Sequence, residues 1–254
     1  MFKKKHFKFK FGDPTLIFFH GLCGNKSHFD KSFSYLKKFG ILTFDLIGFG
    51  MNQKKIIIKN SIINQQAEYV KNIILNLNSN ELVLIFHSLS TVLIPFILKN
   101  NKISKKISKL ILIEGDIVKE QLNWANLLSS MEKKKFNIYI KNFKRNSKMV
   151  MLSQLIAQKN YKPSHSYSFK NFNSILLKKF SKECVKIIRK NKVYLNIKNS
   201  KAKKLLIVSK KNKNLYNRKT QNLFNQIEFI KNSGHYPMID NPLQTYKKIK
   251  KFII

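Results

Sequence analysis

The chain has 254 residues, which is long enough for one domain with a sizeable hydrophobic core. Lysine and arginine number 50 against 12 aspartates and glutamates, a formal net charge of +38 that would suit a nucleic-acid-binding protein. However, only three basic residues are arginine, whose planar side chain suits phosphate recognition, and lysine, asparagine, isoleucine and phenylalanine, which share AT-rich codons, are all frequent. The composition therefore favours compositional drift over a specific nucleic-acid partner. The charge would still attract an anionic or acidic carrier-linked substrate.

The sequence shows no membrane-spanning, secretory or metal-binding signal. No run of about twenty apolar residues occurs, which excludes a transmembrane helix. The apolar run after the basic N-terminus is too short for a secretory signal. The two cysteines, Cys23 and Cys184, and the six histidines lack metal-ligand spacing, so we expect no metal and no cofactor. We predict reduced thiols and a cytoplasmic protein.

Apolar runs and helical patterns alternate along the chain, as in an α/β protein. Near the N-terminus, Phe7, Phe9 and Phe11 alternate with lysines and predict a half-buried edge strand. Six later apolar runs are continuous, which indicates parallel strands buried on both faces. These runs are 15–19, 41–44, 82–86, 110–113, 205–208 and 228–230. Helical spacing of apolar residues predicts a helix over 62–77.

Three short motifs follow predicted strands and contain residues typical of nucleophilic catalysis. They read His-Gly-Leu-Cys-Gly at 20–24, His-Ser-Leu-Ser at 87–90 and Ser-Gly-His-Tyr-Pro at 233–237. A serine hydroxyl becomes a good nucleophile when an imidazole takes its proton. The oxyanion that then forms needs backbone N–H donors, which a glycine-containing loop can supply.

In these motifs and their order the chain resembles the α/β-hydrolase family, over residues 12–254. The resemblance implies a mostly parallel central sheet flanked by helices, with a helical lid after the family's sixth strand, here 110–113. It also implies that Ser88 is the nucleophile and His235 the base. The oxyanion donors would be the backbone N–H groups of Leu22 and Leu89.

The nucleophile turn departs from the family's Gly-x-Ser-x-Gly pattern. Phe86 and Ser90 replace the two glycines. We expect Phe86 to crowd the turn, because the nucleophile of this family is held at a strained positive φ. Asp45 lies in a segment that resembles the family's Asp-x-x-Gly-x-Gly motif, which implies a structural role in fixing loops near the site.

The acid of the triad is harder to assign. In most of the family it follows the strand after the lid, here 205–208, but the loop 209–213 has no carboxylate, and Asn212 lies about where the aspartate would be. Some members carry the acid after the sixth strand instead, where this chain has Glu114 and Asp116. We predict that Glu114 is the acid. Asp116, or no functional acid, remains the alternative.

The segment 117–202 has few strand-like runs and many helical ones, and we predict that it forms the lid. The hydrolase core would then comprise 1–116 and 203–254. We expect that residues of the first motif and of the lid contact the substrate. The candidates are His20, Gly21, Cys23, Trp124 and Leu128, with Leu127 and Met131 as further lid residues.

The sequence thus predicts a serine hydrolase that cleaves a small carboxylic ester or thioester through an acyl-enzyme. A serine at the nucleophile position argues against the dehalogenase and epoxide hydrolase branches, which use aspartate there. Two alternatives stay open. One is a decayed, non-catalytic binding protein with this fold, and the other, less favoured, is a basic nucleic-acid-binding protein.

Overall fold

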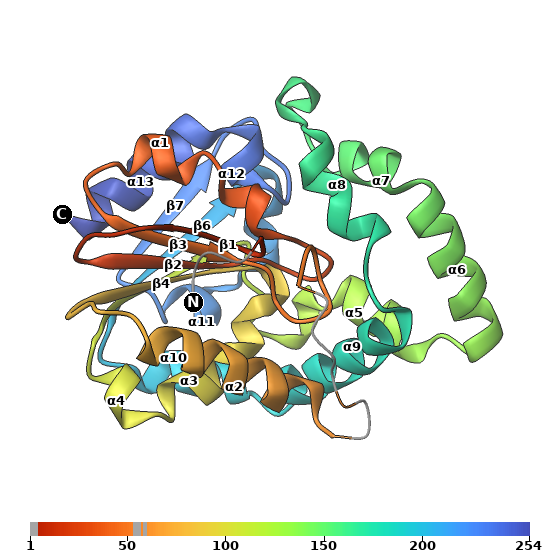
Figure 1. The fold of residues 1–254 in the computed structure, drawn as a ribbon, viewed down its shortest axis with the longest axis horizontal. Coiled ribbons are helices and arrows are strands. Elements are labelled where there is room, and N and C mark those ends of the chain that lie inside the picture. Colours follow the sequence, from red (N-terminus) through yellow and green to blue (C-terminus); the bar gives the residue numbers. More distant parts are fainter. Residues whose placement is uncertain (1–4, 53–56, 58–59) are drawn as a thin grey trace.

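The computed structural model describes residues 5–52, 57 and 60–254. The first four residues of the expected core unit, and 53–56 and 58–59, lie outside the described residues. Within the described part, seven strands form a single sheet (Figure 1). The strands are β1 (Phe7–Lys10), β2 (Thr15–Phe19), β3 (Gly40–Phe44), β4 (Leu82–His87), β5 (Ile107–Ile113), β6 (Lys203–Ser209) and β7 (Gln226–Ile230).

The strand order is β1-β3-β2-β4-β5-β6-β7. β1 is antiparallel to β3, and every other neighbouring pair is parallel. The register aligns His87 with Ile113, and Ile113 with Ile207, so the carboxyl ends of β4, β5 and β6 meet at one edge. Loops that follow parallel strands gather at such an edge, which is where ligands bind in α/β sheets.

The burial of the strands follows the sequence pattern. Every residue of β2, β3 and β4 is buried, as the continuous apolar runs predict. β1 is the half-buried edge strand that the alternating phenylalanines predict, but it ends at Lys10. Phe11 lies beyond it and is 81% exposed, so its assignment to the strand is wrong.

Helices cover both faces of the sheet (Figure 1). α1, α12 and α13 lie on one face, and α2, α3, α4 and α10 lie on the other. The α-helices are α1 (Ser32–Tyr35), α2 (Ile62–Leu75), α3 (Ile94–Leu98), α4 (Asn101–Ser104), α5 (Asn123–Ser130), α6 (Lys133–Arg145), α7 (Ser147–Ser153), α8 (Pro163–Lys170), α9 (Ser174–Arg189), α10 (Lys192–Asn199), α11 (Arg218–Gln221), α12 (Pro237–Asp240) and α13 (Pro242–Ile253). Short 3-10 helices are η1 (Lys26–Phe29), η2 (Ser88–Leu93), η3 (Lys119–Gln121), η4 (Gln158–Asn160) and η5 (Lys210–Leu215).

The long segment between β5 and β6 is helical throughout its regular structure. Its helices α6, α7 and α8 stand beside the sheet, whereas α9 packs against α2 and α10 packs against α3 (Figure 1). A Cβ on Gly48 would lie 2.6 Å from Leu176 of α9, so this helix lies directly against the loop after β3. The division of the chain into a core and a lid at 117–202 stays a prediction.

A carboxylate joins α9 to the start of α2. Glu183 accepts hydrogen bonds from the Ser61 hydroxyl and from the backbone N–H groups of Ile62 and Ile63. These N–H groups lie in the first turn, where a helix has no internal acceptors and where its dipole favours negative charge. These bonds therefore stabilise the start of α2 and fix α9 on the core.

Among the described residues, none of the helices has the length and hydrophobicity that a bilayer-spanning segment requires.

The entry into β3 depends on a close contact between two glycines. A Cβ on Gly40 would lie 2.2 Å from the carbonyl oxygen of Gly12, a backbone atom that cannot swing away. We therefore expect Gly40→Ala to lower the free energy of unfolding by about 1–3 kcal/mol, the usual cost of overpacking. Urea denaturation measures this difference, with the exposed Ser34→Ala as the control. An unchanged midpoint for Gly40→Ala would contradict the contact.

Candidate active site

Ser88 stands at the sharp turn between β4 and η2. Its φ is +54°, a conformation that costs energy for a residue with a Cβ and that is typical of strained functional turns. The first motif lies against it, since a Cβ on Gly21 would be 2.9 Å from the Cβ of Ser88. Only glycine allows the loop after β2 to approach the serine so closely.

Phe86 does not crowd this turn, so the expected steric conflict is wrong. Its ring is fully buried and stacks on Phe19 of the neighbouring strand, with centroids 4.4 Å apart and planes 9° from parallel. Side chains alternate along a strand, and the core takes this one. The hydroxyl of Ser90, at the place of the second glycine, lies 2.8 Å from the carbonyl oxygen of His87 and 3.1 Å from that of Phe19.

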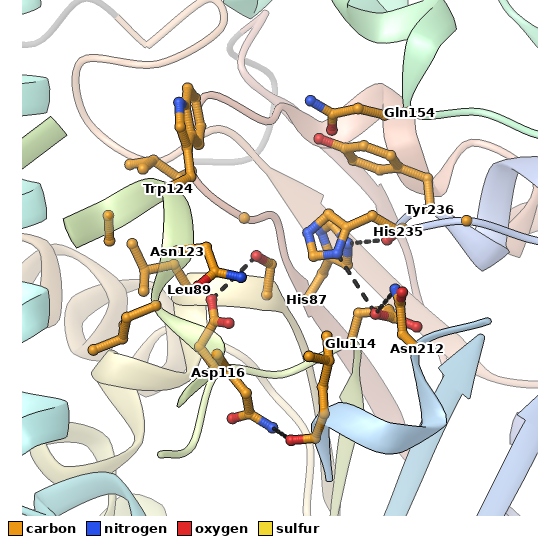
Figure 2. A pocket seen from close by; sticks show the side chains of 18 of the residues that line it. His87, Leu89, Glu114, Asp116, Asn123, Trp124, Gln154, Asn212, His235 and Tyr236 are labelled. Atoms are coloured by element: carbon orange, nitrogen blue, oxygen red, sulfur yellow. Dashed lines mark hydrogen bonds and ion pairs between the residues drawn. The ribbon is translucent and has the colours of Figure 1, made fainter. Parts of the chain in front are cut away.

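His235 and Glu114 lie next to each other at the carboxyl edge of the sheet (Figure 2). Glu114 Oε2 is 3.6 Å from His235 Nδ1, which is longer than a hydrogen bond and within ion-pair distance. Two further donors hold this carboxylate, namely the backbone N–H of Ser209 and the side-chain amide of Asn212 at 2.7 Å. Asn212, which lies about where the acid of most family members would be, thus holds the Glu114 carboxylate in place. The Nδ1 contact leaves Nε2 of the imidazole available to a nucleophile.

The surroundings of His235 act on its pKa in opposite directions. Burial lowers the pKa, whereas the Glu114 carboxylate, and to a lesser degree Asp116, stabilise the imidazolium, and the net effect is a pKa above the usual value of 6.5. An imidazole with a raised pKa holds a transferred proton more readily. It must still be neutral to accept one, which sets an acidic limit to any catalysis by this residue.

The Ser88 hydroxyl donates its hydrogen bond to Asp116 Oδ2 at 3.3 Å. In the described residues it has no hydrogen bond with His235, so the predicted nucleophile and base are not aligned for proton transfer in this structure. Burial raises the pKa of Asp116 to about 7, although the bond from Ser88 lowers it. Near neutral pH this carboxyl group therefore exists in both its neutral and its ionised form.

Two buried groups fix the loop that carries His235. Nε2 of His87 lies 2.8 Å from the carbonyl oxygen of His235, so this nitrogen must carry the proton, and the two rings are 4.8 Å apart. Asp240 accepts the N–H of Gly234 at 2.7 Å. The same carboxylate accepts the N–H groups of Ile156 and Ala157 at 2.9 and 2.8 Å, which connects the loop to the segment after α7.

The loop after β2 is also held in place. Nε2 of His20 accepts the N–H of Leu46 at 2.9 Å, so its Nδ1 carries the proton and donates to the carbonyl of Gly21 at 2.8 Å. Leu89 is the second residue of η2, and the N–H groups of a first helical turn have no partner within the helix. Leu22 and Leu89 both line the cavity beside Ser88. This arrangement suits the two predicted oxyanion donors.

A cavity of about 470 Å³ opens at this edge of the sheet (Figure 2). The predicted site residues that line it are Gly21, Leu22, Ser88, Leu89, Glu114, Asp116, Trp124, Asn212 and His235. Trp124 is fixed there by a hydrogen bond from its indole nitrogen to the Tyr139 hydroxyl, 3.0 Å long.

Other predicted substrate contacts lie outside the cavity. His20, Cys23 and Leu128 have no exposed surface at all and are part of the protein interior. The carbonyl of Cys23 accepts the Ser168 hydroxyl, and the burial of its thiol raises the thiol pKa well above the ordinary value. Leu127 and Met131 also do not line it. Within the described residues, no group of three acidic, cysteine or histidine side chains could hold a metal ion.

Sequence reasoning missed three contacts of the site. It gave no role to the His87 ring, to Asn212 as a donor to Glu114, or to Asp240 as the anchor of the His235 loop. The available signals were positional. His87 directly precedes the nucleophile, and Asp240 is an acidic residue close behind the histidine in a chain with few acidic residues.

The ion pair with Glu114 can be tested on the imidazole itself. Glu114→Gln removes the negative charge that raises the pKa of His235 and keeps one oxygen to accept the Ser209 N–H. Its NH2 group replaces the oxygen that accepts the Asn212 amide. We expect the imidazole pKa to fall, so that the neutral form persists to lower pH. NMR titration of His235 measures this change. The matched control is Glu120→Gln, on the exposed η3, and a pKa that is the same in both variants would contradict the ion pair.

The raised pKa of Asp116 makes folding depend on pH. The unfolded chain loses this proton near pH 3.8 and the folded chain near 7, so the folded state binds more protons in between and its stability falls as the pH rises through this range. Asp116→Asn cannot ionise. We expect it to be more stable than wild type at pH 8 by about 1–4 kcal/mol, with a much smaller difference at pH 4. Urea denaturation at both pH values decides, and a difference that does not change with pH would contradict the shift.

Comparison with known proteins identifies the fold family. The family model described as the alpha/beta hydrolase fold matches residues 14–242. A search of curated proteins finds no match.

Solved structures resemble the chain over nearly its whole length. An N-acyl homoserine lactonase, AidH, crystallised as a mutant with N-hexanoyl homoserine, is 13% identical with a TM-score of 0.75 and coverage of 99% of this chain and 94% of its own. The epoxide hydrolase CorEH is 12% identical, with a TM-score of 0.74 and coverage of 97% and 93%. A lipase-esterase related protein from Clostridium acetobutylicum ATCC 824 is 17% identical, with a TM-score of 0.66 and coverage of 97% and 98%. At these identities the likeness concerns the fold, and the family match settles the assignment: the chain belongs to the α/β-hydrolase family.

Proposed function

We propose that the protein is a serine hydrolase that cleaves a small carboxylic ester or thioester through the triad Ser88, His235 and Glu114. The observation that carries this proposal is the strained serine at the end of β4, which shares one cavity with a histidine paired to a buried carboxylate. A strained residue persists only where the surrounding structure holds it, and such residues gather at active sites.

The reaction begins when the Ser88 hydroxyl turns from Asp116 to Nε2 of His235. As Oγ attacks the carbonyl carbon of the substrate, its proton moves to the imidazole. The N–H groups of Leu22 and Leu89 bind the resulting oxyanion. When the intermediate collapses, His235 gives the proton to the leaving alcohol or thiol, and an acyl-enzyme remains. Water then attacks the acyl group with His235 as base, and the carboxylic acid leaves.

Glu114 orients the imidazole and stabilises its charged form during both steps. Its distance of 3.6 Å from Nδ1 is longer than in a productive triad, but such contacts often shorten only when a substrate binds. Asn212 and Ser209 hold the carboxylate from the other side. Glu114, directly after β5 and held by the Asn212 amide after β6, can therefore take the role that an aspartate after β6 has in most of the family.

The cavity and the nucleophile limit the substrate class. A volume of about 470 Å³ is in the usual range of small-molecule sites, which suits a small-molecule ester. A serine nucleophile supports ester rather than epoxide cleavage, although one structural neighbour is an epoxide hydrolase. A lactonase and a lipase-esterase related protein are also among these neighbours, which is consistent with an ester-type substrate.

One observation favours a second function. Because the Ser88 hydroxyl bonds to Asp116 and not to His235, the same cavity could serve a protein that binds a ligand without turnover. In that case Ser88 would be an ordinary hydroxyl with no enhanced reactivity. The two functions differ in the reactivity of this one side chain.

Labelling with a serine-directed fluorophosphonate distinguishes these functions. We expect a covalent adduct on Ser88 by mass spectrometry, and hydrolysis of short- and medium-chain p-nitrophenyl esters at moderate salt. Ser88→Ala should lose the adduct and lower kcat/KM at least about a thousandfold. Ser153→Ala, which removes a second hydroxyl of the cavity, should keep both. A folded wild type without adduct or hydrolysis would leave the ligand-binding function.

A further inference from the structure

One charged group of the cavity has no part in the proposed triad. Asp116 lines the cavity, and its carboxylate hydrogen-bonds only with the Ser88 hydroxyl among the described residues. In Figure 2, Asp116 and His235 approach the cavity from different sides. Glu114 already fills the position next to Nδ1 of the imidazole. Asp116 acts on the imidazole only through its charge and has no hydrogen bond with it among the described residues, so its carboxylate can also bind a group other than the base.

The main chain of Asp116 is fixed beside the nucleophile turn. The Thr91 hydroxyl donates to the carbonyl oxygen of Asp116, and the N–H of Asp116 lies 3.4 Å from the carbonyl oxygen of Ser88. Ile117, directly after it, is fully buried. The Cα of Asp116 is thus held beside the nucleophile turn, from which its short side chain reaches the cavity.

The proposed reaction takes away the hydrogen-bond donor of Asp116. When the Ser88 hydroxyl turns to His235 and then loses its proton, it can no longer donate to the carboxylate at 3.3 Å. Asp116 is part-buried in the cavity wall. Once a substrate covers this wall and displaces water, a carboxylate without a donor is costly. The reacting complex is therefore favoured by a donor that arrives with the substrate.

The geometry limits where such a donor must lie in the substrate. Ser88 Oγ becomes bonded to the carbonyl carbon, so a carboxylate 3.3 Å from Oγ lies within reach of groups on the first or second carbon of the acyl chain. A hydroxyl can donate to both the neutral and the ionised form of a carboxyl group, which coexist near pH 7 here because burial raises the pKa of Asp116. An ammonium group would gain its charge attraction only from the ionised form.

Resting on the proposed function of this site, we propose that Asp116 recognises a hydroxyl group on the α or β carbon of the acyl chain. The natural substrate is then an ester or thioester of a hydroxy acid. A plain acyl chain would leave Asp116 without a donor, and an acyl chain with a carboxylate there would meet its negative charge. Asp116 is in this sense a specificity-determining residue.

Binding of uncleaved amides tests the recognition without any turnover. We would measure dissociation constants of hexanamide, 2-hydroxyhexanamide and 3-hydroxyhexanamide by NMR titration. We expect one of the hydroxyamides to bind wild type about tenfold more tightly than hexanamide, the range of one hydrogen bond to a charged group. Asp116→Leu should abolish this preference, whereas Asp116→Asn, which keeps an acceptor oxygen, should retain part of it.

Controls exclude a general loss of the site. Glu120→Gln, which changes an exposed carboxylate of η3, should keep the full preference, and thermal unfolding should show that each Asp116 variant is folded. Equal affinity of wild type for the three amides, failure of both hydroxyamides to bind, or a preference that survives in Asp116→Leu would overturn the proposal.

Turnover of the matching methyl esters separates this proposal from the proposed function. If Ser88-dependent hydrolysis occurs with the same kcat/KM for plain and hydroxylated esters, recognition by Asp116 is wrong and the hydrolase stands. If the hydroxyamides bind with the expected preference but no ester is cleaved and Ser88 is not labelled, recognition stands and the hydrolase is wrong.

Discussion

The site depends on the way in which the carboxylate of Glu114 joins three chain segments. The residue has a φ of +49°, and its backbone N–H bonds to the carbonyl of Ile207 on β6. From this turn the side chain reaches the backbone N–H of Ser209 at the end of β6, the amide of Asn212 in the following segment and the imidazole of His235. One strained residue at the end of β5 therefore contacts the proposed base, and the parallel sheet places that imidazole near the turn at Ser88.

Carboxylates are scarce in this chain, and several of them act as anchors. Asp45, Glu114, Glu183 and Asp240 each accept at least one backbone N–H group from a segment distant in sequence. Such charge-assisted bonds are stronger than bonds between neutral groups. In a chain with a net charge of +38, where like charges repel one another throughout, each of these carboxylates adds a favourable contact between segments.

Much of the fold was predictable, because continuous apolar runs mark buried parallel strands and glycine-containing motifs follow their ends. Motif order predicted Ser88 as nucleophile and His235 as base, whereas Glu114 was preferred as the acid with Asp116 or no acid left as the alternative. The direction of the Phe86 side chain could not be predicted, because it depends on which neighbouring strand supplies a stacking partner. The complete burial of His20 could not be predicted either, because a motif gives a residue's place along the chain and not the direction of its side chain.

Asp240 has a mechanical consequence. Its single carboxylate holds the N–H of Gly234, next to His235, and the N–H groups of Ile156 and Ala157. If the helices beside the sheet swing outward to admit a molecule, these residues must either break two charge-assisted bonds or pull the loop of the base with them. Asp240 therefore couples the position of the segment after α7 to the position of the loop that carries His235.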